Sequence, residues 1–332
     1  MHERSPFAFP SEEAELYDRQ IRLWGMHSQE ILCQSKALFL GFGSTQAEIC
    51  KNITLAGMNY VCIIDWVTVQ PQNAVSHLFL NLNTSVGLNR ALASKEGILE
   101  LNPFLQIDTV AVSENTTEIL NCLKKQTNQI SFDIVVASGL NYQTLCEANK
   151  ICRYIEDEYE LSRPRKRKKK QTSFIIVECL GMQSFVFFDI TNQLYTTPAS
   201  KPSGLTEHLD YVDFESFLNT TRVGSEVSNI YWIIRGIYNM EKSMQRMVRL
   251  GDDLSQLEFE LQQTRENTNF CSVAEFIKYR NCEINPICAI IGGLVGQEII
   301  KILVDATVPP IQNFYYFEAI TGKDRIDKIG CI

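Results

Sequence analysis

The chain has 332 residues, of which 45% are hydrophobic and 21% charged, with 31 basic and 39 acidic side chains and a net charge of −8. This length predicts one large or two medium domains with enough chain to bury a core, and the hydrophobic content excludes disorder throughout. A globally acidic chain is not typical of a general nucleic-acid-binding protein.

We expect neither secretion nor membrane insertion. The first thirty residues contain no apolar run of the kind that a secretory signal needs. The most apolar stretch, Ile287–Val304, is interrupted by three polar or charged side chains and predicts a buried helix. The eleven cysteines include no Cys-x-x-Cys pair, so we interpret them as structural thiols of a cytosolic or nuclear protein.

The first predicted element is a helix over about Ser11 to Trp24. Ser11 is a suitable N-cap, acidic residues follow it in the first turns, and Gly25 ends the helix. One side of the helix is predicted to be apolar. The residues of that side are Leu16, Tyr17, Ile21, Leu23 and Trp24.

A strand–turn–helix–strand unit follows, with strands at Lys36–Gly41 and Tyr60–Asp65. Both strands are continuously apolar, which predicts a parallel sheet that is covered on both faces. Alternation of helices and strands continues as far as residue 190. The further predicted elements are helices at about Val86–Leu101 and Tyr142–Tyr159, and strands near Ile107–Val112, Phe132–Ala137, Phe174–Cys179 and Phe185–Phe188.

The pattern changes between about Thr191 and Cys271 to loops and long polar helices such as Ser228–Leu261, without a strand signal. A core helix at Ala289–Leu303 and a final strand at Asn313–Glu318 then return to the earlier pattern. We therefore predict an α/β domain made of residues 1–190 and 271–332, interrupted by a helical or irregular insertion over 191–270.

A glycine loop joins the first strand to the next helix. Gly41 and Gly43 have the spacing that lets a backbone approach a phosphate at a helix N-terminus, and Asp65 ends the second strand. Gln46 stands where a third glycine would be expected. Spacing alone leaves two interpretations open: a nucleotide site, or a turn that needs glycine only for its geometry.

A basic run, Arg163–Lys170, has seven positive residues in eight and is predicted to lie in an exposed loop. A nuclear localisation signal is the favoured interpretation. A nucleic-acid patch and a solvated loop that neutralises nearby acidic surface remain alternatives.

The segment Tyr17–Gly25, YDRQIRLWG, strongly resembles the opening motif of the activating enzymes for ubiquitin and ubiquitin-like modifiers, relatives of the bacterial adenylating proteins of the ThiF/MoeB type. The supporting segments are Gly41–Gly57, Val86–Ala91, Pro286–Glu298 and Asn313–Phe317. Several of them look like the smaller, non-catalytic subunit of heterodimeric SUMO-activating enzymes. The resemblance implies a Rossmann-like adenylation fold with a mainly parallel sheet flanked by helices, and with the insertion in place of a catalytic-cysteine domain.

Compared with active members of this family, the chain departs at the positions that handle ATP and magnesium. The replacements are Gln46 for a glycine, Trp66 and Val67 after the aspartate, Ser76 and His77 for an arginine and a glutamine, Leu140 for a magnesium-binding aspartate, and Arg90 for a lysine. The resemblance therefore implies no metal site and no bound cofactor in this chain. The degenerate remnants of the nucleotide site would be Gly41, Gly43, Asp65, Arg90 and Asn141.

Arg19 is the family position that survives. It matches an arginine donated in trans to the ATP phosphates bound by the partner. The resemblance thus implies a regulatory subunit, inactive alone, that pairs with a catalytic subunit holding ATP and Mg²⁺ and that meets SUMO through the complex. From the basic run Arg163–Lys170 we expect the nucleus as well as the cytoplasm, and from composition and charge we expect no membrane binding and no general nucleic-acid binding.

Three alternatives stay open. The chain could serve the neddylation enzyme, although the corresponding subunit there is much longer. It could be a homodimeric adenylyltransferase, which the replaced residues disfavour, or a scaffold of the same fold that contributes no residue to the chemistry. Substitution of Arg19 separates the scaffold from the trans-acting subunit.

Overall fold

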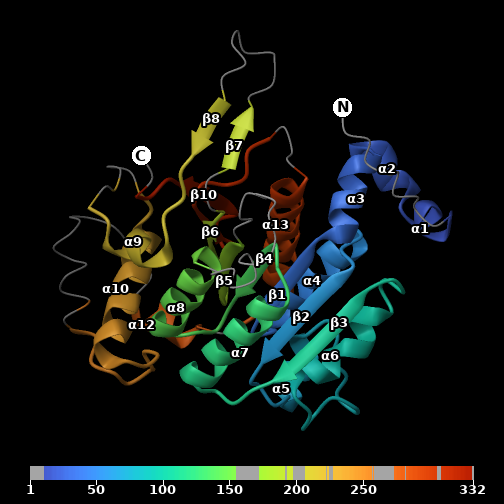
Figure 1. Cartoon of the computed structure of the whole chain (residues 1–332). Helices are drawn as coiled ribbons and strands as arrows, with labels where there is room; N and C mark the ends of the chain where they lie inside the picture. The colour runs from blue at the N-terminus through green and yellow to red at the C-terminus, as the bar shows by residue number, and fades with distance from the viewer. Residues whose placement is uncertain are drawn as a thin grey trace.

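An eight-stranded sheet organises the protein (Figure 1), in the strand order β10-β9-β6-β5-β4-β1-β2-β3. This computed structural model describes residues 11–154, 172–190, 193–196, 206–221, 223, 227–255, 257, 273–280, 282–304 and 308–330. The strands are β1 Lys36–Leu40, β2 Tyr60–Asp65, β3 Gln106–Ala111, β4 Ile134–Ala137, β5 Ser173–Leu180, β6 Gln183–Asp189, β9 Phe314–Glu318 and β10 Lys323–Asp327. β1 to β5 pair in parallel, and β6, β9 and β10 continue the sheet antiparallel. The predicted Rossmann-like α/β fold is confirmed.

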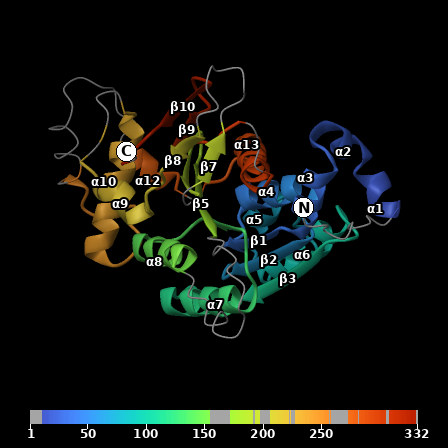
Figure 2. The same cartoon turned by 45° about the horizontal axis from the view of Figure 1, so that its top comes forward.

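Helices cover both faces of the sheet (Figure 2). One face carries α3 Met26–Gln34, α4 Ser44–Leu55, α6 Arg90–Leu99 and α13 Asn285–Leu303. The other carries α7 Thr116–Gln129, α8 Tyr142–Arg153, α9 Phe214–Asn219, α10 Asn229–Met244 and α12 Val273–Lys278. Shorter helices lie at the ends of the sheet: α1 Ser11–Leu16, α2 Asp18–Trp24 and α5 Pro71–Ser76.

Strand β1 shows why the strands read as continuously apolar. Its Ala37 and Phe39 belong to the core on the α4 side, and Leu38 and Leu40 belong to the core on the α8 side. Because successive side chains of a strand point to opposite faces, a strand buried between two helical layers must be apolar at every position. The sheet is therefore a buried middle layer.

The predicted core helix near the C-terminus is α13. Among the described residues, it alone is long and apolar enough to cross a membrane, but about half of it is buried against the rest of the protein. Two glycines allow it to lie directly on α4. A Cβ added at Gly292 would lie 2.4 Å from the Cβ of Glu48, and one added at Gly296 would lie 2.8 Å from the Cβ of Asn52.

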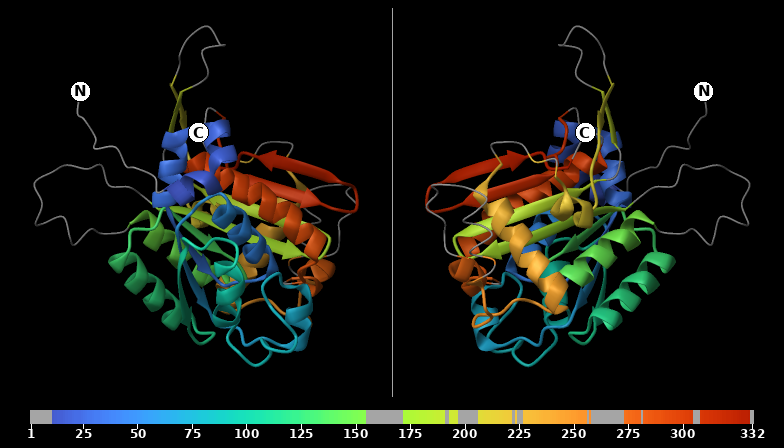
Figure 3. Two further views of the ribbon diagram at one scale, coloured as in Figure 1. Left: turned by 90° about the vertical axis from the view of Figure 1, so that its right-hand side faces the viewer. Right: turned by 90° about the vertical axis from the view of Figure 1, so that its left-hand side faces the viewer.

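The interpretation of residues 191–270 needs correction. An antiparallel hairpin, β7 Gln193–Thr196 with β8 Thr206–Leu209, lies in a region where no strand was predicted (Figure 3). The helix expected over Ser228–Leu261 ends at Met244, because Gln245 adopts a left-handed conformation with φ 56°. The α10 helix is not polar all round: its apolar side is buried. It packs with α9 onto the same core as the sheet, and the boundaries predicted for the insertion remain a prediction.

Several other elements also differ from the prediction. The first predicted helix is divided into α1 and α2, and Gly25 ends α2 as expected. Helix α6 begins at Arg90 rather than near residue 86, because the Asn89 side chain caps Ala91 N and Leu92 N. Helix α7, whose sequence is mostly polar, was missed, as were α3, α5 and α12. Helix α8 ends at Arg153 rather than near residue 159, and β10 follows the strand expected to be the last.

Candidate functional site

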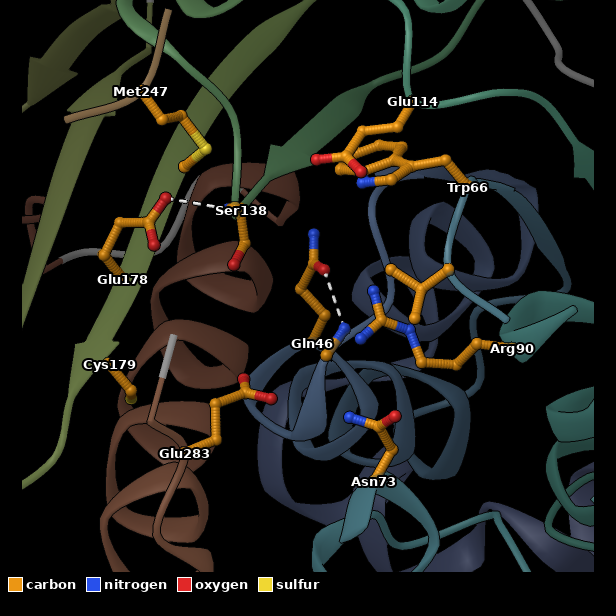
Figure 4. Close-up of a pocket in the computed structure, with 13 residues that line it drawn as sticks. Gln46, Trp66, Asn73, Arg90, Glu114, Ser138, Glu178, Cys179, Met247 and Glu283 are labelled. Atoms are coloured by element: carbon orange, nitrogen blue, oxygen red, sulfur yellow. Dashed lines mark hydrogen bonds between the residues drawn. The ribbon is translucent and has the colours of Figure 1, made fainter. Parts of the chain in front are cut away.

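A pocket of about 250 Å³ lies where β1, β4 and β5 end and α4 begins (Figure 4). In open α/β sheets, ligands bind at this carboxyl edge. The volume is below the roughly 300–1,000 Å³ of typical small-molecule pockets. Gly43, Arg90 and three glutamates, Glu114, Glu178 and Glu283, are among the residues that line it.

Gly41 opens the loop above α4 and is required for close packing. Its φ is 79°, and a Cβ there would approach the backbone oxygen of Ser138 to 2.8 Å. The indole ring of Trp66 lies on the same glycine, 3.2 Å from that Cβ position. The backbone face that a glycine loop would offer to a phosphate is therefore covered by protein atoms.

Gln46 fills the position of the expected third glycine. Its side chain is fully buried, accepts a hydrogen bond from Gly43 N at 3.2 Å, and donates to the carbonyls of Leu40 (3.0 Å) and Val136 (3.1 Å). Figure 4 shows the side chain pointing into the middle of the site. All these partners are backbone groups, so Gln46 locks the loop to β1 and β4.

Asp65 and Arg90 form an ion pair in which Arg90 lines the pocket and Asp65 is buried below it. Arg90 donates from Nε to Oδ2 at 2.6 Å and from Nη2 to Oδ1 at 3.1 Å, and Asp65 is fully buried. Oδ1 of Asp65 also accepts from Trp66 N at 2.8 Å and Val67 N at 3.2 Å. The aspartate therefore binds the protein's own groups, and two donors of the arginine are held by it.

Glu283 occupies the N-terminus of α4. Its Oε2 accepts a hydrogen bond from Ser44 N at 2.6 Å, and its Oε1 accepts from Thr45 N at 2.9 Å and Thr45 Oγ1 at 3.0 Å. The first N–H groups of a helix attract negative charge because they have no partner within the helix. Here an internal carboxylate from a residue more than two hundred positions away satisfies them.

Two further buried carboxylates bind backbone N–H groups at the same edge. Glu178 accepts from Gly139 N at 2.8 Å, and Glu241 accepts from Tyr142 N at 3.0 Å. Burial raises the pKa of Glu178 to about 7, although the neighbouring Arg280 and the bond from Gly139 oppose this shift. The Arg280 guanidinium, itself buried, forms an ion pair with Glu241.

Ser76 and His77 contact backbone groups of the protein. Nε2 of His77 lies 2.9 Å from the carbonyl oxygen of Phe42, and Nδ1 accepts from Phe79 N at 3.3 Å. A carbonyl on one ring nitrogen and an N–H on the other are satisfied together by a neutral ring protonated at Nε2. Burial lowers the pKa of His77 to about 4, and Ser76 Oγ contacts Asn73 O at 3.5 Å.

Asn141 is the N-cap of α8. Its side-chain oxygen accepts from Thr144 N at 2.9 Å, which is a structural contact. The preceding Leu140 is buried in the core beside the sheet. Asn141 lines a second, adjoining pocket rather than the one formed by Gly43 and Arg90. The structure therefore brings four of the predicted remnants together and places the fifth beside them.

Arg19 lies on α2, exposed to solvent and distant from this pocket. The Gln20 side chain donates to Leu55 O at 2.8 Å, which anchors α2 at the C-terminal end of α4. The pocket lies at the N-terminal end of α4, and twelve helical residues span about 18 Å. Figure 3 shows the N-terminal helices at one end of the molecule and the α5 segment of the pocket at the other. Arg19 and the pocket of its own chain thus form two separate sites.

The sequence interpretation missed the residues that close the pocket. Only Glu178 gave a signal, because it is a single carboxylate within the otherwise apolar strand β5. Glu283 gave none, because its partners are distant in the chain.

Of the described cysteines, only Cys282 is exposed, and no described group of His, Cys, Asp and Glu could hold a metal ion. The basic run Arg163–Lys170 lies outside the described residues.

Comparisons with known proteins agree with this geometry. The ThiF family model matches residues 17–329. SUMO-activating enzyme subunit 1 of Dictyostelium discoideum is 30% identical, with 95% of this chain and 93% of the relative covered. Subunit 1B-1 of Arabidopsis thaliana is also 30% identical (96% and 97% covered), and the DNA damage tolerance protein rad31 of Schizosaccharomyces pombe is 27% identical (96% and 98%).

Solved structures show the same fold at much lower identity. PaaA matches with a TM-score of 0.59 at 14% identity, over 100% of this chain and 78% of its own. MccB of E. coli, solved with succinimide, matches with a TM-score of 0.54 at 13% identity, over 95% and 72%. These two likenesses concern the fold alone.

Proposed function

The chain belongs to the ThiF family and, within it, to the SUMO-activating enzyme subunit 1 proteins, and from this premise we propose that it is the regulatory half of a heterodimer. A larger catalytic subunit would bind ATP and Mg²⁺, adenylate the C-terminus of SUMO and form the thioester. This chain would donate Arg19 in trans to the ATP phosphates and would be inactive alone.

The observation that carries this proposal is the separation of Arg19 from the pocket of its own chain. Arg19 lies on α2, where the neighbouring Gln20 binds the C-terminal end of α4, whereas the pocket lies at the N-terminal end, about 18 Å away along the helix. An arginine side chain does not span that distance. This separation supports a role for Arg19 at a phosphate bound by another chain that approaches α2.

The surface around Arg19 also supports a partner. Helix α2 buries none of its residues, and Leu16 and Leu23 are 52% and 77% exposed. Apolar side chains gathered on an exposed helical arm are typical of a surface that another protein covers. Of the predicted apolar side of this helix, Tyr17 is buried, whereas the two leucines are left for a partner.

The lining of the pocket supports the proposal that this chain does not bind ATP itself. Gln46 and Trp66 cover the glycine loop, Asp65 holds Arg90, and no described cluster suits a metal ion. Adenylyl and phosphoryl transfer depend on positioned cationic groups that neutralise phosphate charge. Three glutamates line this pocket, which is the opposite of what a triphosphate requires.

Arg19 would act through charge. Its guanidinium is permanently protonated and presents a rigid fork of donors that suits two phosphate oxygens at once. Placed at a partner's ATP, it would stabilise the negative charge that develops during adenylation. The chemistry itself would remain in the catalytic subunit.

ATP–pyrophosphate exchange in the presence of SUMO tests the proposal. The purified chain is assayed alone and again with the catalytic SUMO-activating subunit. We expect exchange only in the mixture. Exchange by the chain alone would contradict the proposal, because it would make this chain an adenylating enzyme; no exchange in the mixture would contradict the assigned partner.

We also propose that the chain occupies the nucleus as well as the cytoplasm, directed by Arg163–Lys170. Deletion of the run should reduce nuclear accumulation, and its transfer to a cytoplasmic reporter should move the reporter into the nucleus. The reporter arm separates import by this run from import by a partner. A reporter that stays cytoplasmic would contradict the signal.

A further inference from the structure

We propose that Glu283 is an internal occupant of the anion site at the N-terminus of α4, and that its carboxylate keeps the N–H donors of this helix end from phosphate-bearing ligands. The inference concerns this chain by itself and does not depend on the partner proposed above. It assigns a role to a residue that the sequence motifs did not indicate.

The geometry is that of a bound anion. Both carboxylate oxygens of Glu283 accept hydrogen bonds, from Ser44 N, Thr45 N and Thr45 Oγ1, at 2.6 to 3.0 Å. Such bonds to a charged acceptor are shorter and stronger than bonds between neutral groups. The same helix-terminal N–H groups bind phosphates where a glycine loop precedes a helix.

Gly43 shows how closely the carboxylate approaches the loop. A Cβ at Gly43 would lie 2.6 Å and 2.7 Å from the two carboxylate oxygens of Glu283. A glycine allows a ligand to touch the backbone at this point, and the ligand in contact here is the protein's own side chain. Figure 4 shows Glu283 beside Gln46, on the side of the pocket where α13 begins.

The residues around Glu283 hold it in place. The carbonyl of the preceding Cys282 accepts from Gly181 N at 2.8 Å, which fixes the segment to the turn between β5 and β6. The following Ile284 is the N-cap of α13. Because both neighbours are fixed, the carboxylate binds without the loss of freedom that an external anion would suffer.

Two other polar side chains that line the pocket already have protein partners. Arg90 is turned to Asp65, and the amide of Gln46 is used by backbone partners. The N–H groups of Ser44 and Thr45 are therefore the donors that an entering phosphate would need. Loss of Glu283 would free these donors and would remove one negative charge from the pocket.

The test compares the wild-type chain with Glu283→Ala, using inorganic pyrophosphate as the probe in isothermal titration calorimetry at low ionic strength. We expect Glu283→Ala to bind pyrophosphate about 10-fold or more tightly than the wild type, which corresponds to about 1.4 kcal/mol. Pyrophosphate should also raise the thermal midpoint of the variant more than that of the wild type.

Glu114→Gln is the matched control, because Glu114 lines the same pocket, is exposed, and makes no bond to α4. It removes the same charge and should gain much less affinity for pyrophosphate. Equal gains in the two variants would overturn the proposal in favour of general repulsion by an acidic pocket. A folded Glu283→Ala chain that binds no more tightly than the wild type would also overturn it.

Glu283→Gln covers the case in which the alanine variant does not fold. The amide keeps the size of the side chain and loses its charge, so pyrophosphate should compete with it better than with the carboxylate. A folded glutamine variant with wild-type affinity for pyrophosphate would overturn the proposal as well. Neither assay contains SUMO or a second subunit, so the outcome is independent of the exchange experiment.

Discussion

The two ends of helix α4 have opposite characters. At its N-terminal end, the polar groups of the pocket are paired within the chain: Glu283 with α4, Asp65 with Arg90, and Gln46 with the backbone. At its C-terminal end, α2 projects with Arg19 in solvent and Leu23 exposed. In the first region these polar groups bind other groups of the same chain. In the second region, the exposed arginine and leucine could bind another surface. This contrast is the basis for the proposal that Arg19 on the arm, rather than the pocket, takes part in the reaction.

The difference follows from where the polar groups are buried. A buried charge without a partner is costly, so the pocket retains charges only as pairs or as acceptors of backbone N–H groups. An exposed arginine has no such cost and is free to bind a phosphate elsewhere. Substitutions in the pocket should therefore change stability, and substitutions in the arm should change activity.

The largest effect on stability is expected from Arg280→Met. The guanidinium is buried, forms an ion pair with Glu241, and lies 5.3 Å from the centre of the Tyr238 ring. Its loss leaves buried carboxylates uncompensated, which should lower the free energy of unfolding by about 3–5 kcal/mol in urea denaturation. Arg246→Met is the control, because Arg246 pairs with Asp252 near the surface, where solvent screens the charges, and its loss should change the stability much less. A similar loss of unfolding free energy in both variants would contradict the expected difference between the buried ion pair and the surface ion pair.

The next effect concerns pH. The pKa of Glu178 is raised by burial from 4.5 to about 7, so the folded chain binds this proton more tightly and stability falls as pH rises through that interval. The pKa of His77 is lowered by burial from 6.5 to about 4, so stability rises with pH between those values. Each group contributes up to about 3 kcal/mol, with opposite sign. The two contributions should largely cancel between pH 4.5 and 6.5.

Single variants separate the two contributions. In Glu178→Gln, the His77 contribution remains, and the free energy of unfolding should rise with pH across this interval by up to about 1.4 kcal/mol per unit. In His77→Gln, the Glu178 contribution remains, and the free energy should fall with pH. Urea denaturation at half-unit steps measures both slopes. Slopes of equal sign in the two variants would contradict the assignment.

A smaller effect in free energy, but a decisive one for function, is expected from Arg19→Ala. With the catalytic subunit and SUMO present, adenylation should fall about 10-fold or more while the heterodimer still forms. Arg22→Ala is the control on the same helix, because Arg22 pairs with Asp18 at 2.9 Å and should leave the rate nearly unchanged. Unchanged turnover in Arg19→Ala would instead favour the scaffold.

The smallest effect is expected from Leu23→Ser. Leu23 is 77% exposed, so the free energy of unfolding of the chain alone should change by no more than about 0.5 kcal/mol. Binding to the catalytic subunit should weaken by about 1 kcal/mol if α2 is covered by it. Ile320→Ser, at 74% exposure on the turn between β9 and β10, is the control and should leave binding unchanged. Equal binding by both variants would place the partner elsewhere.

Several features of this protein were determined by the sequence itself. The periodicity of β1 and β2, the glycine loop and the apolar α13 predicted the parallel sheet and its helical layers, because such signals are local and strong. The motif around Arg19 predicted the family, which the relatives confirmed. Predictions were weaker where packing overrides composition: α7 is polar overall, and α10 turned out to be buried along one side.

The state of the pocket was decided only by the tertiary structure. Gln46 and the replaced residues indicated a degenerate site, but the sequence did not reveal that Glu283 reaches the N-terminus of α4 or that Trp66 lies on Gly41. These contacts join residues far apart in the chain, and no local pattern encodes them. The same holds for the distance between Arg19 and the pocket, because only the packed length of α4 sets the two apart.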